Sequence, residues 1–233
     1  MMRAALLALA LALPGGAALA EPLAPFAAEY RIHVNKIPTP IKATLVLEPA
    51  PGEDRYRMLF EADSFMLTNT EESWFEWNDC EPRTERYVHE FQGFGKHRYH
   101  HTDFSWSPPR AVNSDSKEGK ESFDIPADAL DELTMLLRAR CVFATGDKEY
   151  TATSVYGDRI RQHHFIVIDR ETLDTPMGEL DTLIVEKRRK GDRKEKRRTL
   201  FWVAPAKDYM VVKARHIEST LLRGELIMID YGN

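Results

Sequence analysis

The sequence has few cysteines and no long apolar run beyond its first twenty residues. Its 233 residues include two cysteines, Cys80 and Cys141, and no C-x-x-C pair of the kind that thiol–disulfide catalysts use. No later apolar stretch approaches the roughly 18 residues that a membrane-spanning helix needs. A G-x-S-x-G nucleophile elbow, a Walker loop and a dinucleotide-binding fingerprint are also missing from the sequence. We therefore expect no nucleotide or other cofactor and no membrane-spanning segment.

The N-terminus has the composition of a secretory signal peptide. Arg3 precedes an apolar run, Ala4 to Leu13, which ends before the small-residue site Ala18-Leu19-Ala20. This order predicts a signal peptide at residues 1–20 and leaves residues 21–233 as a single domain. Because no cysteine stands at the cleavage point to carry a lipid, we expect the mature protein to be released into the bacterial periplasm. We also expect it to be a monomer.

Charge and cysteine content narrow the class of protein further. The formal charge is −5 at pH 7, which argues against a general affinity for nucleic acid. In an exported protein an even pair of cysteines predicts one disulfide, here Cys80–Cys141. Such a bridge, which closes a loop of about 60 residues, would contribute on the order of 4 kcal/mol to stability. Two unpaired buried thiols are the alternative.

The dominant sequence period is two, which is typical of half-buried strands. Apolar residues alternate with polar ones from Phe26 to Val34, and Pro38 and Pro40 then indicate a turn. Further strands are expected at 41–47, 56–62, 71–77, 84–91, 96–106, 150–155, 161–169, 180–188, 199–203, 210–217 and 222–231. About twelve short strands in chain order predict an antiparallel meander.

One segment has helical spacing instead. Leu130, Leu133, Leu136 and Leu137 would share a helix face, with Asp128 as the N-cap and basic residues in the last turn. A bridge from Cys141 to Cys80 would fasten this helix to the region around Trp74 to Trp77, as a lid or plug. Closing a long sheet removes its edges, so we expect an all-β, antiparallel β-barrel or barrel-like roll with one covering α-helix. A flat two-sheet sandwich is the alternative.

Several motifs resemble a known family. They are Glu171 to Gly178 (ETLDTPMG), Arg198 to Pro205 (RTLFWVAP), Asp208 to Lys213 (DYMVVK) and the acidic start of the helix at Asp131. On these residues the chain resembles the uncharacterised exported bacterial family catalogued as domain of unknown function 3108, from Phe26 to Tyr231. The family tends to have proline where Val211 stands here. The resemblance implies a barrel-like antiparallel fold in the cell envelope, and it lends no catalytic residues.

Metal and catalytic sites are weakly indicated. On a strand, His97, His101 and Asp103 share one face, but nothing in the sequence requires a metal there, and histidines on a surface or in strand pairing explain them better. The paired acids Glu71-Glu72 would point to opposite faces of a strand. We therefore expect that the protein is not an enzyme.

Two residue groups are candidate sites. Aromatic residues gather in one third of the chain, and they either line an apolar pocket or fill a core. The candidate ligand-binding residues are Trp74, Trp77, Phe91, Tyr99, Phe104 and Trp106. Nine basic residues between positions 187 and 198 indicate a hairpin that either contacts anionic headgroups or guards a strand edge. The candidate anion-binding residues are Lys187, Arg188, Arg189, Arg193, Arg197 and Arg198.

Together these features favour a non-enzymatic periplasmic protein that binds a lipid or another amphiphilic envelope component. An envelope scaffolding module that binds anionic polymer or a partner protein through the basic hairpin is the first alternative. A hydrolase without a recognisable motif is the second.

Overall fold

The computed structural model describes residues 23–115, 119–189 and 198–232. Within them, fifteen strands form one sheet in the order β8-β7-β6-β5-β4-β3-β2-β1-β15-β14-β13-β12-β11-β10-β9. Neighbouring strands are antiparallel, except that β9 pairs with β10 in parallel. The predicted signal peptide, residues 1–20, lies outside the described residues.

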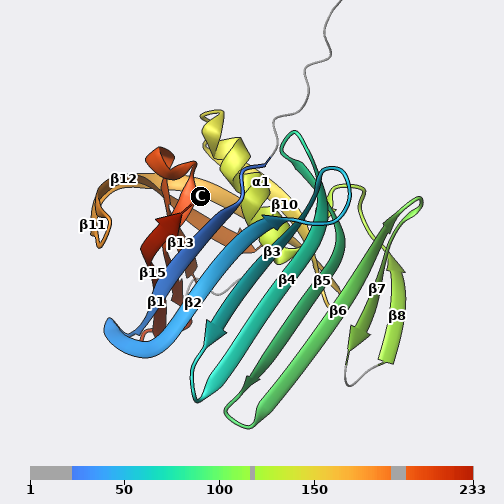
Figure 1. Ribbon diagram of the computed structural model, residues 1–233, viewed down its shortest axis with the longest axis horizontal. Coiled ribbons are helices and arrows are strands. Elements are labelled where there is room, and N and C mark those ends of the chain that lie inside the picture. The colour runs from blue at the N-terminus through green and yellow to red at the C-terminus, as the bar shows by residue number, and fades with distance from the viewer. Residues whose placement is uncertain (1–22, 116–118, 190–197, 233) are drawn as a thin grey trace, which may run out of the picture.

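The strands divide into two contiguous halves of this sheet (Figure 1). The N-terminal half consists of β1 (Phe26–Val34), β2 (Ile37–Pro49), β3 (Arg55–Asp63), β4 (Leu67–Asn78), β5 (Glu81–Gly93), β6 (Lys96–Trp106), β7 (Pro109–Asp115) and β8 (Gly119–Asp124). The C-terminal half consists of β9 (Ala129–Leu130), β10 (Glu149–Tyr156), β11 (Arg159–Thr175), β12 (Gly178–Arg189), β13 (Arg198–Ala204), β14 (Met210–Ile217) and β15 (Arg223–Gly232). A helix, α1 (Glu132–Ala144), and a short 3-10 helix, η1 (Pro205–Lys207), complete the described chain.

The expected antiparallel sheet is confirmed, but it is not closed into a barrel. It curls around α1 (Figure 1), and β8 and β9 remain its two edge strands. β9 contacts β5 without pairing with β8. β9, the edge strand that would have to meet β8 to close the sheet, is only two residues long, because α1 begins at Glu132. The fold is therefore an open roll, and the described residues form neither a closed barrel nor a two-sheet sandwich.

The helix lies inside the curl and serves both halves. Leu133 and Leu137 belong to the main cluster, which contains residues of β1 to β5 and of β11 to β15. Met135, Ala139 and Phe143 join a second cluster with Phe165 and other residues of β10 to β13. The helix thus acts as a plug between the two sides of the curled sheet.

Local details differ from the sequence expectations at two places. The first turn falls at Asn35 and Lys36, which have φ values of 52° and 69°, and Pro38 and Pro40 lie within β2. Asn tolerates this left-handed conformation better than most residues, and the prolines are accommodated near the end of the strand. The expected set of about twelve strands also lacked β7, β8 and β9. The short sequences of β7 and β8 are mostly polar and do not alternate clearly, and β9 consists of Ala129 and Leu130 alone.

Candidate functional site

A cavity of about 310 Å³ lies between α1 and the concave face of the sheet. Its walls come from β1 to β4, from β13 to β15 and from one side of α1, and include Leu45, Met58, Phe60, Leu136, Phe201 and Leu226. A volume near 300 Å³ is at the lower end of small-molecule pockets. The cavity therefore has the size and the apolar walls of a site for one small or slender ligand.

The N-terminus of α1 is fixed by one buried carboxylate. The side chain of Asp131 accepts hydrogen bonds from the backbone N–H groups of Leu133 and Thr134, at 2.8 and 3.0 Å. Ser73 Oγ of β4 and Thr84 Oγ1 of β5 donate to its other oxygen, at 2.7 and 2.6 Å. Asp131, and not the expected Asp128, is the N-cap, because the helix starts one turn later than the apolar spacing indicated. These bonds tie α1 to the N-terminal half of the sheet.

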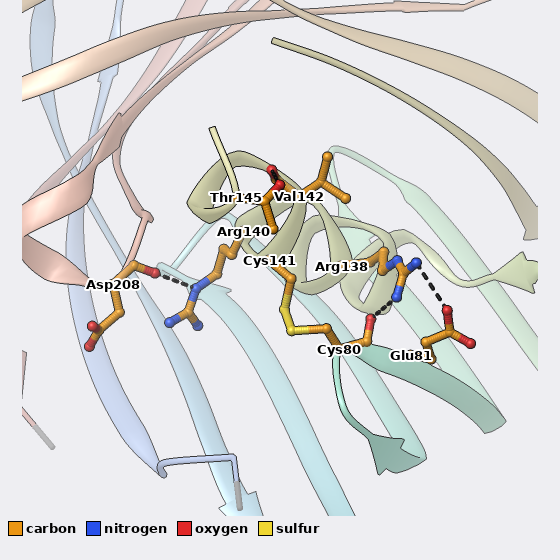
Figure 2. The surroundings of a disulfide bond; sticks show 8 residues. All are labelled: Cys80, Glu81, Arg138, Arg140, Cys141, Val142, Thr145 and Asp208. Carbon is orange, nitrogen blue, oxygen red and sulfur yellow. Dashed lines mark hydrogen bonds and ion pairs between the residues drawn. A yellow bond between two sulfur atoms is a disulfide. The ribbon is translucent and has the colours of Figure 1, made fainter. Parts of the chain in front are cut away.

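The C-terminal part of α1 is fixed by the disulfide. Cys80, in the β4–β5 turn, is bonded to Cys141 with a Cα–Cα distance of 5.9 Å, as the sequence predicted. Figure 2 shows Arg138 and Arg140 on either side of this bridge. Arg138 donates to the backbone oxygen of Cys80 and to Glu81. The cavity wall formed by α1 is therefore held at both ends.

Two carboxyl groups lie at the end of the cavity nearest the N-terminus of α1. Burial raises the pKa of Glu71, against the lowering effect of the hydrogen bond that Tyr87 donates to it at 2.6 Å. Burial also acts to raise the pKa of Glu132, but Lys187, whose Nζ is 2.8 Å away, keeps that pKa below its usual value. Each of the two carboxyl groups therefore already has a partner within the protein, Tyr87 for Glu71 and Lys187 for Glu132.

Arg140 lines the cavity eight residues further along α1, about 12 Å from Glu132 at 1.5 Å per residue. Its Nε donates to the backbone oxygen of Asp208 at 2.9 Å (Figure 2). Its Nη1 is buried and has no hydrogen-bond partner among the described residues. Burial lowers the pKa of this guanidinium. A buried guanidinium nitrogen without a partner is rare in folded proteins, so Arg140 stands out among the residues of the cavity.

The six candidate aromatic residues do not form one pocket. Trp77, Phe91, Phe104 and Trp106 fall on the concave face, in register with buried neighbours. Trp74 and Tyr99 fall on the opposite face, where Trp74 lies under Arg57. Trp106 lines a separate cleft of about 410 Å³ that has a largely polar lining. Trp77 belongs to the main core cluster, and Phe104 packs against it.

The candidate basic residues are partly neutralised within the protein. Lys187 is paired with Glu132, and Arg188 and Arg198 both bind Glu186, each at 2.6 Å. Arg189 is the last residue of β12. Arg193 and Arg197 lie outside the described residues. The described part of this stretch is therefore less available to an external anion than its composition suggested.

The histidines of β5 and β6 are engaged with protein groups. His97 is paired with Glu90, and His101 lies 3.1 Å from Asp103. His89 contacts Tyr156 Oη at 2.6 Å and Asn69 at 2.9 Å. Within the described parts of the chain, no group of His, Cys, Asp and Glu side chains is arranged to hold a metal ion.

Ser154, His163 and Glu132 form a buried group that superficially suggests a nucleophile and base. Ser154 Oγ is 2.9 Å from His163 Nε2 and 2.9 Å from Glu132. The carboxylate is thus beside the serine and Nε2, whereas a catalytic triad places it on Nδ1. Ser154 is 0% exposed, so this geometry stabilises the junction of α1 and β10 and gives a substrate no access.

The sequence reasoning missed most residues of the cavity. Tyr30, Phe201 and Leu226 appeared only as members of expected strands, and Arg140 only as a residue of the last helical turn. Their convergence depends on how the sheet curls around α1. The apolar side of the expected helix, together with an arginine on it, was the one sequence signal of this site.

Comparison with known proteins places the chain in a family. The family model described as "Protein of unknown function (DUF3108)" matches residues 29–223. The chain belongs to this family. The resemblance noted from its C-terminal motifs is thereby confirmed, and DUF3108 carries no assigned reaction or ligand in its description.

Other comparisons with this DUF3108 protein are weaker. No curated protein matches it. A solved structure, described as a "putative lipoprotein" from Parabacteroides distasonis, covers 91% of this chain and 97% of its own, with 9% sequence identity and a TM-score of 0.35. Within the described residues, no helix is long and apolar enough to span a membrane.

Proposed function

We propose that this protein is an exported, non-catalytic binding protein that holds a single-chain amphiphile in the cavity between α1 and the concave face of the sheet. The observation that carries the proposal is this cavity, with apolar walls, a buried arginine at one end and, at the other, two carboxyl groups that already have partners within the protein. An acyl chain would be removed from water along the apolar walls, at roughly 25 cal/mol per Å².

Arg140 defines the expected ligand chemistry. Its unpartnered Nη1 would bind a carboxylate or phosphate headgroup, while the chain would run along α1 toward Glu71. A disulfide is typical of oxidising compartments, and the signal-like N-terminal sequence points to export, so we place the protein in the periplasm. The buried state of Ser154 supports binding over hydrolysis.

The first experiment asks whether the site is occupied. Native mass spectrometry of protein taken from its own compartment should detect a bound single-chain lipid. Delipidated protein should gain thermal stability with a long-chain fatty acid. Ala214→Phe, which fills the cavity, should abolish this gain, while Ala144→Phe at an exposed position should not. Absence of both a retained ligand and a fatty-acid effect would reject the proposal.

A second experiment tests the headgroup. Arg140→Gln should weaken binding of a fatty acid by about tenfold to a hundredfold, the range for hydrogen bonds to a charged group. Binding of an uncharged monoacylglycerol should change little. Arg138→Gln is the matched control, because Arg138 bonds outside the cavity, to Cys80 and Glu81. Equal losses for both ligands would show that Arg140 does not recognise the anion.

A further inference from the structure

Most of the large apolar side chains that are exposed in the described chain lie at one end of the sheet. In an antiparallel meander, alternate turns fall at the same end, and the turns β1–β2, β3–β4, β5–β6 and β14–β15 share one (Figure 1). We call the following exposed residues on or beside these turns the apolar rim: Ile37, Phe65, Met66, Phe94, Leu221 and Leu222. Ile160, after the β10–β11 turn, also lies toward this end.

These residues are unusual for turns. Phe65, Phe94 and Leu221 are 87%, 66% and 85% exposed, whereas turns normally carry glycine or small polar residues. Phe94 also has a φ of 50°, a conformation that a bulky side chain adopts at a steric cost. Because packing within the protein does not offset that cost, the exposed ring points to a role outside the chain.

Specific contacts order the rim into two groups of neighbouring turns. Leu67 pairs with Gly93, which places the β3–β4 turn beside the β5–β6 turn. Asn35 Nδ2 donates to Leu221 at 3.0 Å, and the backbone of Asn35 donates to Arg223 at 2.8 Å, which joins the β1–β2 and β14–β15 turns. The apolar side chains are therefore held in place on paired hairpins.

Positive charge accompanies the rim. Lys36, Lys96 and Arg98 are exposed at the same turns, and none of the ion pairs of the described chain includes them. Of the nearby acids, Glu90 is paired with His97 at 2.8 Å and Asp158 with Arg159 at 3.4 Å, whereas Asp63 accepts a hydrogen bond from Thr68 and is in none of the ion pairs of the described chain. Unpaired cations interspersed with projecting apolar side chains match the interface of an anionic bilayer, where headgroups meet acyl chains.

The spacing of the turns favours a fluid surface over a second protein. Lys42 pairs with Asp63, the last residue of β3 before the β3–β4 turn. Ile37 therefore lies five residues beyond the end of β3, roughly 17 Å along the strand. A protein interface needs a close-packed core, which separated hairpin tips do not provide. Lipids can fill the gaps between them.

We propose that the apolar rim is a membrane-docking surface that inserts its hairpin tips into the headgroup region of an anionic bilayer. The cavity reaches this end of the sheet, because Thr199 and His216, which line it, pair one position from the rim ends of β13 and β14. A docked protein would thus present its cavity to the lipid surface. The docking itself does not require that the cavity be filled.

The test is flotation of the purified protein with vesicles. The protein should bind vesicles that contain phosphatidylglycerol, bind pure phosphatidylcholine more weakly, and lose binding as salt is raised. The double substitution Phe65→Ser with Phe94→Ser should reduce partitioning on the order of a hundredfold, because two exposed aromatic rings no longer leave water on docking. Lys36→Gln and Lys96→Gln should each reduce it about fivefold.

Two control variants separate docking through the rim from a general effect of exposed apolar residues and from cavity binding. Ile168→Ser removes an exposed apolar residue that lies away from the rim, and it should bind vesicles like the original protein. Ala214→Phe should also dock normally, so that failure of cavity binding and failure of docking are distinguishable. Unchanged partitioning of the double rim variant would overturn the proposal. A rim-dependent dimer in sedimentation, with no vesicle binding, would overturn it in favour of self-association.

Discussion

The two halves of the sheet bury their faces differently. In the N-terminal half, strands such as β1 and β5 alternate between buried and exposed positions, because the concave face covers α1 and the convex face meets solvent. In the C-terminal half, consecutive residues are buried: positions 152–155 in β10 and 202–204 in β13. The first half is a one-sided sheet, and parts of the second are covered on both sides.

One row across the convex face shows the change. Cross-strand pairing places Asp63, Lys42, Arg31, Ile227, Lys213 and Trp202 side by side. The row begins with exposed charges and ends at Trp202, which is 3% exposed. The far end of β11 covers this region: its Glu171 accepts a hydrogen bond from Trp202 Nε1 at 2.6 Å, and β11 contacts β15 although three strands separate them in the sheet. Coverage by a curled hairpin, and not composition alone, buries the outer face of this half. Leu173, Leu180 and Trp202 on this side belong to the main hydrophobic cluster.

The largest expected effect comes from separating the halves at α1. Asp131→Ala removes the buried acceptor for Ser73 and Thr84 of the N-terminal half and for two backbone N–H groups of α1. We expect a loss of about 4 to 5 kcal/mol, because several buried donors lose their partner. Urea denaturation measures it. The exposed Asp128→Ala is the control, and a loss no larger than that of the control would contradict this assignment.

The difference in burial between the halves is tested by two tryptophans on the convex face. Trp202→Ala in the covered half should cost about 4 kcal/mol, and Trp74→Ala in the solvent-facing half about 1 kcal/mol. Equal losses in chemical denaturation would mean that coverage by β11 does not stabilise the burial of Trp202. Phe165→Ala, within the α1 cluster, provides a reference for a fully buried aromatic residue.

The disulfide links the N-terminal half of the sheet covalently to α1. Replacing both Cys80 and Cys141 by serine should lower stability by about 3 kcal/mol, because the unfolded chain regains the freedom of a loop of 61 residues. Differential scanning calorimetry of the variant, and of the original protein with and without reductant, measures the effect. A variant as stable as the oxidised protein would show that Asp131 alone fixes α1.

Acid should also lower the stability of the protein, by no more than removal of the disulfide does. Burial lowers the pKa of His89 in β5 and of His163 in β11 to about 4 each. Since these values are below the 6.5 of an unfolded histidine, the unfolded chain binds more protons between pH 4 and 6.5, and stability is lost as the pH falls through that window. We expect a loss on the order of 2 to 3 kcal/mol in total.

The contribution of the histidines to the pH dependence of stability can be separated from that of the acidic residues. The raised pKa of Glu71 acts in the opposite direction, since it favours proton uptake by the folded state. The double substitution His89→Gln with His163→Gln should flatten the pH dependence of the denaturation midpoint, while His97→Gln at an exposed position should not. A slope that survives the double variant would assign it to other groups.

Much of the strand pattern followed from the sequence, and its failures have physical causes. The alternation from Phe26 to Val34 coincides with β1, because one face of that strand is exposed. The expectation of a strand ending at Asp169 was wrong, since β11 continues to Thr175 beyond a bulge at Val167. Its later residues alternate weakly because they cover another part of the sheet. The apolar face of α1 that lines the cavity was predictable from the sequence. The wall that the sheet contributes was not.

The sequence by itself determined the strand-rich composition, the pairing of Cys80 with Cys141 and the family, because these depend on local alternation, residue type and motif. Only the tertiary structure decided that the sheet stays open, that α1 lies inside it and that Arg140 faces an apolar hollow. Those features depend on twist and curl accumulated over fifteen strands, which no short stretch of residues specifies.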